Sequence, residues 1–314
     1  MKINSFIKDN IRFIEIENNN TFKVTFANFG ASIFSVQLNG TYLTRNVKNM
    51  SDFKLLDQYY GKTIGRVSNR TKQIFNVKPN EGKNILHGGY HSLSNVYFDD
   101  EFIEEKDKII VAFKTIQKES FDGYPGDLNV VVKYIIHNDK NELDIFYEAS
   151  SNKDTVVSLT NHTFWTLGSK NLSNLSLRIN SRKYLDVNPN DLLPTEIKEV
   201  NEVFDFSKEK LITKDIGDAS VHQLRLNGYD HYFYFNDNNG NVLALRNDKY
   251  KLEIETDFEG VQIYTHGFDN KKPLYPECEY LYNSIAIEPS DSFKELHLLN
   301  KNEKYQRYIK IKIG

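Results

Sequence analysis

Apolar and polar residues alternate with a period of two along much of this chain. Residues 22–26 and 33–38 are the first such runs, and the second ends at an Asn39-Gly40 turn. Because successive side chains of a β-strand point to opposite faces, this alternation predicts strands with one buried face. Further strands are predicted at residues 109–113, 130–136, 143–147, 156–159, 175–179, 242–245, 252–256, 261–265, 285–287 and 308–313.

Turn signals separate these runs, at Asp122-Gly123, Asn227-Gly228 and Asn239-Gly240. Helical periodicity is confined to two short segments, residues 52–59 and 201–206. Many short strands with frequent turns and few helices predict an all-β protein, a large antiparallel β-sandwich. The chain has no internal repeat and no linker rich in Pro, Gly or Ser, so residues 1–314 are predicted to form a single domain.

The composition narrows the class of protein. A chain of 314 residues can bury a sizeable core, and its 39% hydrophobic and 26% charged residues are an ordinary balance for a globular protein. The 19 Tyr and 21 Phe suit strands, and they also suit sugar-binding clefts, where aromatic rings pack on C–H faces. A net charge of -3 with interspersed signs argues against a nucleic-acid partner.

Cys278 is the only cysteine, which excludes an intrachain disulfide and a metal site of the multi-cysteine type. Residues 1–5 lack the apolar core of a signal peptide, and no apolar run reaches membrane-spanning length. A cytoplasmic protein without a membrane partner is expected.

Gly65-Arg66-Val67-Ser68-Asn69-Arg70 is the first candidate polar motif. A guanidinium offers a rigid fork of donors for hydroxyl or carboxylate oxygens. Arg66 therefore either binds a ligand or forms a structural ion pair that holds the Gly65 turn. The spacing favours Arg66 over Arg70 for the first role.

His87 precedes Gly88-Gly89 in a long polar loop that continues to His91. Two glycines let the backbone turn tightly or approach a ligand closely, and such loops often carry binding residues. The alternative is a loop histidine that only satisfies backbone groups.

Asp230 follows the Asn227-Gly228 turn and begins a predicted strand at residues 231–233. It either caps that turn or accepts hydrogen bonds from two vicinal hydroxyls of a sugar.

The strongest catalytic candidates are His162, in Asn161-His162-Thr163-Phe164-Trp165, and Glu288, which follows the apolar residues 285–287 and precedes Pro289. A histidine held at a strand end is suited to act as a general acid near neutral pH. Glu288 is expected to be at least half-buried at the end of its strand, and burial raises the pKa of a carboxylate. A carboxylate beside His162 is expected to raise the pKa of the imidazole. Structural roles, for His162 as a buried polar residue and for Glu288 at the rim of a sheet, are the alternatives.

A metal site is not predicted. No His-x-His, His-x-x-His or His-Glu-x-x-His spacing connects the histidines, and Gly88-Gly89 disfavours a helix between His87 and His91. Phosphate-binding and dinucleotide-binding glycine motifs are absent as well.

Together these motifs resemble the aldose 1-epimerase (galactose mutarotase) family. Each motif is weak alone, whereas their common order along nearly the whole chain is specific. They are Gly65–Arg70, Asn80-Glu81-Gly82-Lys83-Asn84-Ile85-Leu86-His87-Gly88-Gly89, residues 122–128, Asn161–Trp165, Leu193-Pro194-Thr195, Phe204-Asp205-Phe206, Tyr229-Asp230-His231 and Ile287-Glu288-Pro289.

The resemblance implies a β-sandwich of the galactose-mutarotase type that interconverts the α and β anomers of free hexoses such as galactose and glucose. It implies Glu288 as the base that takes the anomeric hydroxyl proton and His162 as the acid that protonates the ring oxygen. Substrate-binding roles are implied for Arg66, Asn69, His87 and Asp230. No cofactor is implied, and the chain is expected to act on a small-molecule sugar as a monomer or homodimer.

Three departures from the family pattern affect its expected sugar preference: residues 90–98, Glu259 and Ser290. Three other functions remain open. Arg66 and Arg70 could clamp a sugar phosphate, Asp230 and Glu288 could form a glycosidase pair, or the same fold could bind carbohydrate without catalysis.

Overall fold

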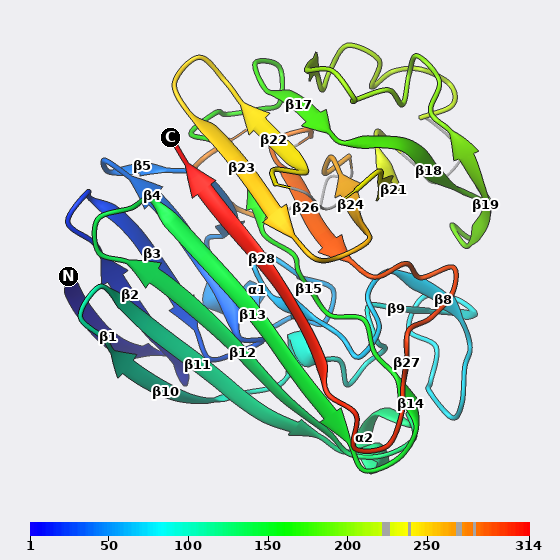
Figure 1. The fold of residues 1–314 in the computed structure, drawn as a ribbon, viewed down its shortest axis with the longest axis horizontal. Coiled ribbons are helices and arrows are strands. Elements are labelled where there is room, and N and C mark those ends of the chain that lie inside the picture. Colours follow the sequence, from blue (N-terminus) through cyan, green and yellow to red (C-terminus); the bar gives the residue numbers. More distant parts are fainter. Residues whose placement is uncertain (222–226, 238–239, 268–271, 279–280) are drawn as a thin grey trace.

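The computed structural model describes residues 1–314 except 222–226, 238–239, 268–271 and 279–280. Within the described residues the named strands pair antiparallel and the chain is nearly all β (Figure 1), so the predicted fold class is confirmed. Asn239 of one predicted turn lies outside the described residues. None of the described helices has the length and apolar character needed to cross a membrane.

The largest sheet among the described residues has nine strands, and its long members cross the front of Figure 1. Alternation is strict in β13, where every second residue from Leu143 to Ser151 is buried. In spatial order the strands are β10 (Asp99–Glu104), β11 (Lys108–Gln117), β12 (Leu128–His137), β13 (Glu142–Ser151), β28 (Tyr305–Ile313), β23 (Lys251–Thr256), β22 (Leu243–Arg246), β17 (Ser176–Ile179) and β20 (Lys210–Leu211).

A second sheet has eight strands in the described part of the chain. Its central strands β24 and β26 pair in a register that places Gln262 opposite Glu288. In spatial order the strands are β19 (Pro194–Glu199), β18 (Ser181–Val187), β21 (Asp230–Phe235), β24 (Gly260–Tyr264), β26 (Ile285–Ser290), β16 (Phe164–Trp165), β6 (Thr44–Val47) and β25 (Leu274–Tyr275).

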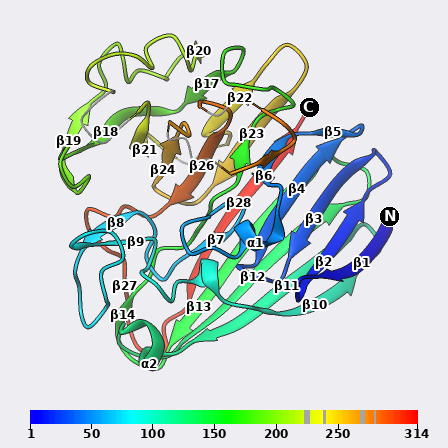
Figure 2. The same ribbon diagram turned by 180° about the vertical axis from the view of Figure 1, so that it is seen from behind.

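The remaining strands form one five-stranded sheet and three two-stranded pairs. The five-stranded sheet lies at the N-terminal side (Figure 2) and comprises β1 (Lys2–Lys8), β2 (Ile11–Glu17), β3 (Phe22–Ala27), β4 (Ser32–Leu38) and β5 (Thr41–Tyr42). The pairs are β7 (Thr63–Ile64) with β15 (Thr160–Asn161), β8 (Arg70–Lys72) with β9 (Asn84–Leu86), and β14 (Thr155–Val156) with β27 (Leu298–Leu299).

One hydrophobic core joins the large sheets. Ile145 and Tyr147 of the nine-stranded sheet share this core with Val261, Ile263 and Ile287 of the eight-stranded sheet. Because side chains alternate along a strand, the neighbours of these last three residues point to the opposite face of the eight-stranded sheet. That face is where the polar residues Gln262 and Glu288 lie.

Several local predictions differ from the structure. The helix expected at residues 52–59 is the single turn α1 (Met50–Phe53), whereas α2 (Glu119–Asp122) and a 3-10 turn (Leu93–Asn95) were not predicted. Residues 201–206 form a turn and no helix, and in this turn the side-chain oxygen of Asn201 accepts the N–H groups of Val203 and Phe204.

Strand ends also differ from the prediction. The strand expected at 156–159 ends at Val156. The strand of Glu288 does not end there, since β26 continues through Pro289, which lies opposite Val261.

Candidate active site

A cavity of about 250 Å³ opens on the outer face of the eight-stranded sheet. Three adjacent strands supply its floor with Asp230 (β21), Gln262 and Tyr264 (β24) and Glu288 (β26). These four side chains share one face because the register places Tyr264 opposite Asp230 and Gln262 opposite Glu288. The period of two along each strand therefore brings together residues that are up to 58 positions apart (Asp230 to Glu288) in the sequence.

His162 lies between β15 and β16 and faces Glu288 across the cavity floor. Its Nε2 atom is 3.3 Å from Oε1 of Glu288, and both side chains are almost fully buried, at 5% and 1% exposure. The second oxygen of Glu288, Oε2, and Nδ1 of His162 have no hydrogen-bond partner among the described residues. The pair thus combines one acid and one base at one point of a cavity that can hold a small molecule.

Burial dominates the pKa values of this pair. It raises the pKa of Glu288 well above the ordinary value, and the charge of Asp230 adds to this effect while Arg70 opposes it. Burial also lowers the pKa of His162, and the positive charges of His266 and Arg70 act in the same direction. The expected rise for Glu288 is confirmed, but the expected rise for His162 is wrong because desolvation of the imidazolium outweighs the nearby carboxylate.

His87 lies beside His162, with 5.3 Å between the ring centroids and an edge-to-face geometry. Its backbone is left-handed (φ 52°), and the following Gly88 packs so closely on the Gly65-Arg66 backbone that a Cβ would lie 2.6 Å from the Gly65 oxygen. The Asn69 N–H donates to Nδ1 of His87 over 3.2 Å. This bond fixes the neutral tautomer with hydrogen on Nε2, so His87 presents a donor to the cavity.

The same tautomer bears on metal binding. Ligand atoms of His87, His162 and Glu288 lie within 4.8 Å of one another, which is close enough for a metal ion. A metal on Nε2 of His87 requires hydrogen on Nδ1, where the Asn69 N–H already donates. The hydrogen bonding of His87 therefore favours a sugar hydroxyl over a cation as its partner.

Asp230 is held at the cavity by two side chains. Its Oδ1 accepts a hydrogen bond of 2.6 Å from Nε2 of Gln262, and its Oδ2 lies 3.2 Å from the Arg70 guanidinium. Arg70 also forms a two-pronged pair with Glu81, at 2.7 and 3.3 Å. The amide nitrogen Nδ2 of Asn69 and the oxygen Oε1 of Gln262 have no hydrogen-bond partner in the described part of the chain. This end of the cavity can therefore both donate to and accept from hydroxyl groups.

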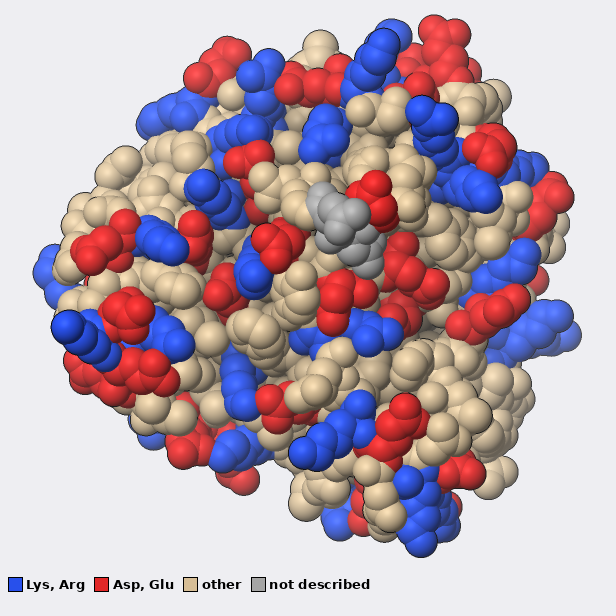
Figure 3. Space-filling model, in the orientation of Figure 1, with Lys and Arg blue, Asp and Glu red and all other residues tan. Residues whose placement is uncertain are grey.

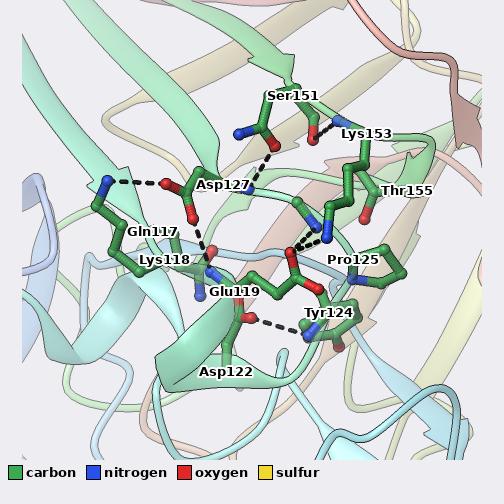
Figure 4. Close-up of polar contacts among 12 residues, drawn as sticks. Gln117, Lys118, Glu119, Asp122, Tyr124, Pro125, Asp127, Ser151, Lys153 and Thr155 are labelled. Carbon is green, nitrogen blue, oxygen red and sulfur yellow. Dashed lines mark hydrogen bonds and ion pairs between the residues drawn. The ribbon is translucent and has the colours of Figure 1, made fainter.

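Arg66 lies elsewhere, which corrects its predicted place at the ligand. Its guanidinium forms an ion pair of 3.0 Å with Asp122 and donates to the carbonyls of Pro125 and Gly126, and both charged side chains are fully buried. Figure 4 shows the surrounding turn, where Asp122 accepts the Tyr124 N–H and Lys118 pairs with Asp127. The alternative of a structural ion pair is the correct one for Arg66.

Several residues that line the cavity are not among the predicted site residues, and four of them contact the predicted ones or each other's neighbours: Tyr59, Arg70, Gln262 and His266. Tyr59 packs on the rings of His87 and His162, at 4.6 and 5.7 Å. His266 bonds to the Tyr60 hydroxyl over 2.8 Å. Gln262 was visible in the sequence as a polar residue between two apolar ones in a predicted strand, which is the signal that would have found it.

The three departures from the family pattern do not line the cavity. Residues 90–98, Glu259 and Ser290 are all absent from its described lining. Ser290 is fully buried, and its carbonyl accepts the Tyr232 hydroxyl over 2.7 Å.

Comparisons with known proteins agree with this geometry. Residues 12–312 match the aldose 1-epimerase family. The chain is 28% identical to an aldose 1-epimerase of Haemophilus influenzae over 303 residues, which cover 88% of this chain and 85% of that protein. It is 33% identical over 198 residues to the bifunctional protein GAL10 of Pachysolen tannophilus, and this match covers 56% of the chain but only 29% of that longer protein.

Among solved structures, galactose 1-epimerase from Lactobacillus acidophilus superposes with a TM-score of 0.90 and 26% identity, over 100% of this chain and 99% of that one. The β-sandwich fold is shared with this solved structure, and the family match extends over nearly the whole chain. The chain belongs to the aldose 1-epimerase family.

Proposed function

We propose that the protein interconverts the α and β anomers of a free hexose, galactose or glucose, with Glu288 and His162 as the proton-transfer pair. The observation that carries this proposal is their buried contact of 3.3 Å at the floor of the cavity. Family membership supports it, and so does the name of the Lactobacillus acidophilus galactose 1-epimerase. The chain acts in this proposal as a single domain and needs no cofactor.

In the forward direction the Glu288 carboxylate removes the proton from the anomeric hydroxyl while His162 donates a proton to the ring oxygen. The bond between C1 and the ring oxygen breaks, and C1 becomes an aldehyde. Rotation about the C1–C2 bond turns the other face of the aldehyde toward the ring oxygen. On closure Glu288 gives its proton back to the carbonyl oxygen, which becomes the anomeric hydroxyl again. His162 takes the proton of the hydroxyl that re-forms the ring oxygen, so both groups are regenerated.

The pKa shifts of Glu288 and His162 determine which of the two side chains carries their shared proton. Without substrate, burial favours a neutral Glu288 and a neutral His162, which together hold one proton. A bound sugar donates a hydrogen bond to the carboxylate and accepts one from the imidazolium, and both bonds favour the charged forms. Substrate binding therefore moves the proton from Glu288 to His162 and produces the pair that the reaction needs.

A sugar phosphate is a poorer candidate for this cavity. Its described lining contains three carboxylates, Asp57, Asp230 and Glu288, against the single guanidinium of Arg70. That guanidinium already pairs with Asp230 and Glu81, and Arg66 lies outside the cavity. The local charge therefore disfavours a phosphate dianion. The glycosidase alternative needs Asp230 as a second catalytic carboxylate. Both oxygens of Asp230 are already bound, by Arg70 and Gln262, which favours a substrate-binding role for it instead.

Polarimetry of freshly dissolved α-D-galactose and α-D-glucose tests the proposal. Glu288→Gln and His162→Asn are each expected to lower kcat by roughly 10²–10⁴-fold. The matched control is His137→Asn, because His137 forms a similar pair of 3.0 Å with Asp144 on the outside of the sandwich. Acceleration by the wild type that survives in both folded cavity variants would overturn the assignment of the pair. No acceleration of either sugar would overturn the free-hexose reaction.

A non-catalytic binder would saturate with sugar yet leave the rate of mutarotation at that of buffer. Isothermal titration with galactose alongside the polarimetry separates this alternative. For the active pair, kcat/KM is expected to form a plateau wider than the roughly two-unit gap between ordinary Glu and His pKa values. The shifts reverse the ordinary order of the two groups. The pKa of His162, lowered to about 3, sets the acid limit of the one-proton pair, and the raised pKa of Glu288 sets its basic limit.

A further inference from the structure

A buried tyrosine links the two chain segments that carry Glu288 and His162. Tyr305 of β28 is 2% exposed, and its hydroxyl accepts the Leu159 N–H over 3.2 Å and donates to Oδ2 of Asp291 over 2.8 Å. Leu159 precedes His162 by three residues, and Asp291 follows Glu288 by three residues. One phenol oxygen therefore connects both segments from the core side.

Further side-chain bonds strengthen this link. Arg307 lies two residues after Tyr305 and contacts Oδ1 of Asp291 at 2.9 and 2.8 Å. The hydroxyl of Thr160 donates to the carbonyl of Pro289 over 2.7 Å. These contacts are charge-assisted or buried, which are the conditions under which hydrogen bonds contribute most to a fixed geometry.

The backbone alone does not supply this connection. In the described residues β16 pairs with β26 on the C-terminal side of His162, whereas β15 on its N-terminal side pairs with β7 and not with β26. Side-chain hydrogen bonds therefore join the segment before His162 to the segment of Glu288, since no backbone hydrogen bond among the described residues joins β15 to β26. They are made by Tyr305 with Asp291, by Thr160, and by Ser158, whose hydroxyl donates to the Asp291 carbonyl over 3.3 Å.

We propose that Tyr305, supported by Asp291, is a positioning residue that sets the distance between His162 and Glu288, and that Thr160 is a second one. This inference rests on the proposed proton-transfer roles of that pair. Neither Tyr305 nor Thr160 lines the described cavity, so both act through the segments they hold and not by contact with the sugar.

Tyr305→Phe tests the proposal because it keeps the ring and removes the bridging hydroxyl. We expect kcat to fall roughly 10- to 100-fold with KM changed less than about 2-fold, since a misplacement of about 1 Å can lower a rate up to about 100-fold. We also expect a narrower pH plateau, because separated groups share their single proton over a smaller pH range. The matched control is Tyr147→Phe, which removes a fully buried hydroxyl that has no hydrogen-bond partner among the described residues.

A pair of variants at Thr160 keeps the test valid if Tyr305→Phe folds poorly. Thr160→Val removes the hydroxyl at nearly constant volume and is expected to lower kcat, whereas Thr160→Ser retains the donor and is expected to restore it. Folded variants with unchanged kcat and pH profile would refute the positioning role, as would equal losses in Tyr305→Phe and Tyr147→Phe. If Glu288→Gln and His162→Asn themselves remain active, the proposed function has failed and not the positioning role alone.

Discussion

Two arginines four residues apart in one motif, Arg66 and Arg70, have different surroundings and different roles. The Arg66 guanidinium is bound by backbone carbonyls and by Asp122, and both charged side chains have no exposed area. The Arg70 guanidinium is bound by the carboxylates of Glu81 and Asp230, and the side chains of Arg70 and Asp230 are 18% and 11% exposed.

The two arginines differ in whether their ion-pair partner is exposed. The carboxylate that pairs with Arg70 is partly exposed at a cavity, as a ligand site requires, whereas the carboxylate that pairs with Arg66 is fully buried, as in a structural ion pair. Both regions contain buried charges and a few polar atoms without partners. In the Arg70 region such atoms, on Asn69, Gln262 and Glu288, line the cavity that also contains His162, and Arg66 is not among the described residues that line it. The residue type and its spacing are the same in both cases, so they cannot distinguish the two roles.

The largest effect is expected for Arg66→Met. It leaves the buried Asp122 carboxylate without its cation, which costs about 3–5 kcal/mol of unfolding free energy. Urea unfolding measures this loss, while kcat per folded molecule is expected to stay near the wild-type value. Arg66→Met combined with Asp122→Asn should recover part of the stability, and a failure to do so would contradict the ion-pair explanation.

A smaller effect on stability and a larger one on turnover is expected for Arg70→Gln. We expect kcat/KM to fall roughly 100-fold, because Asp230 loses the cation that orients it. Arg70 also lowers the pKa of Glu288, so its removal should raise that pKa further and move the pH profile of kcat/KM toward higher pH. Arg178→Gln, at a surface arginine, serves as the control. A shift toward lower pH would contradict the assignment.

Lys62 extends the comparison because its buried Nζ has no hydrogen-bond partner among the residues that the structure describes. Its Nζ lies 4.9 and 5.1 Å from the ring centroids of Phe29 and Phe53, and burial lowers its pKa to about 7. The folded state thus prefers the neutral amine more than the unfolded state does. Stability should therefore rise as the pH increases from about 7 toward the unfolded pKa of about 10.4.

Thermal unfolding between about pH 7.5 and 9.5 checks this sign. Lys62→Met should remove this contribution to the slope and leave a flatter dependence of Tm on pH. If the Tm of the wild type and of Lys62→Met change equally with pH over this range, the folded state does not disfavour the charged form of Lys62 and this explanation is wrong.

The smallest effect is expected for Lys118→Ala, in the turn next to Arg66 (Figure 4). Lys118 pairs with Asp127 over 2.8 Å, but the two side chains are 46% and 31% exposed. Solvent screening limits such a pair to less than about 1 kcal/mol of stability, with no effect on turnover. A loss comparable to that of Arg66→Met in urea unfolding would contradict the distinction between buried and exposed pairs. Acidic and basic side chains are interspersed over the face in Figure 3, so other pairs of this kind are expected to contribute as little.

The sequence predicted the strands best where alternation is long, as in the core of β12 and β13. It failed at the short segment that begins with Asn201, where a turn, with the side-chain oxygen of Asn201 as acceptor, stands in place of the expected helical segment. Five of the six predicted site residues line one cavity, and Arg66 does not; the five are Asn69, His87, His162, Asp230 and Glu288. Which arginine of the motif faces the cavity depends on contacts with residues 122–126, about 60 positions away, and no local pattern records them.

By itself the sequence determined the class of fold, the polar residues available for proton transfer and their order along the chain. Local alternation suffices for this because the pleat of a strand assigns each residue to a face. Only the tertiary structure decided which of these residues meet, since the register of β21, β24 and β26 places Asp230, Gln262 and Glu288 side by side. It also decided the pKa shifts of Glu288 and His162, because burial is a property of the whole packed molecule and not of any segment.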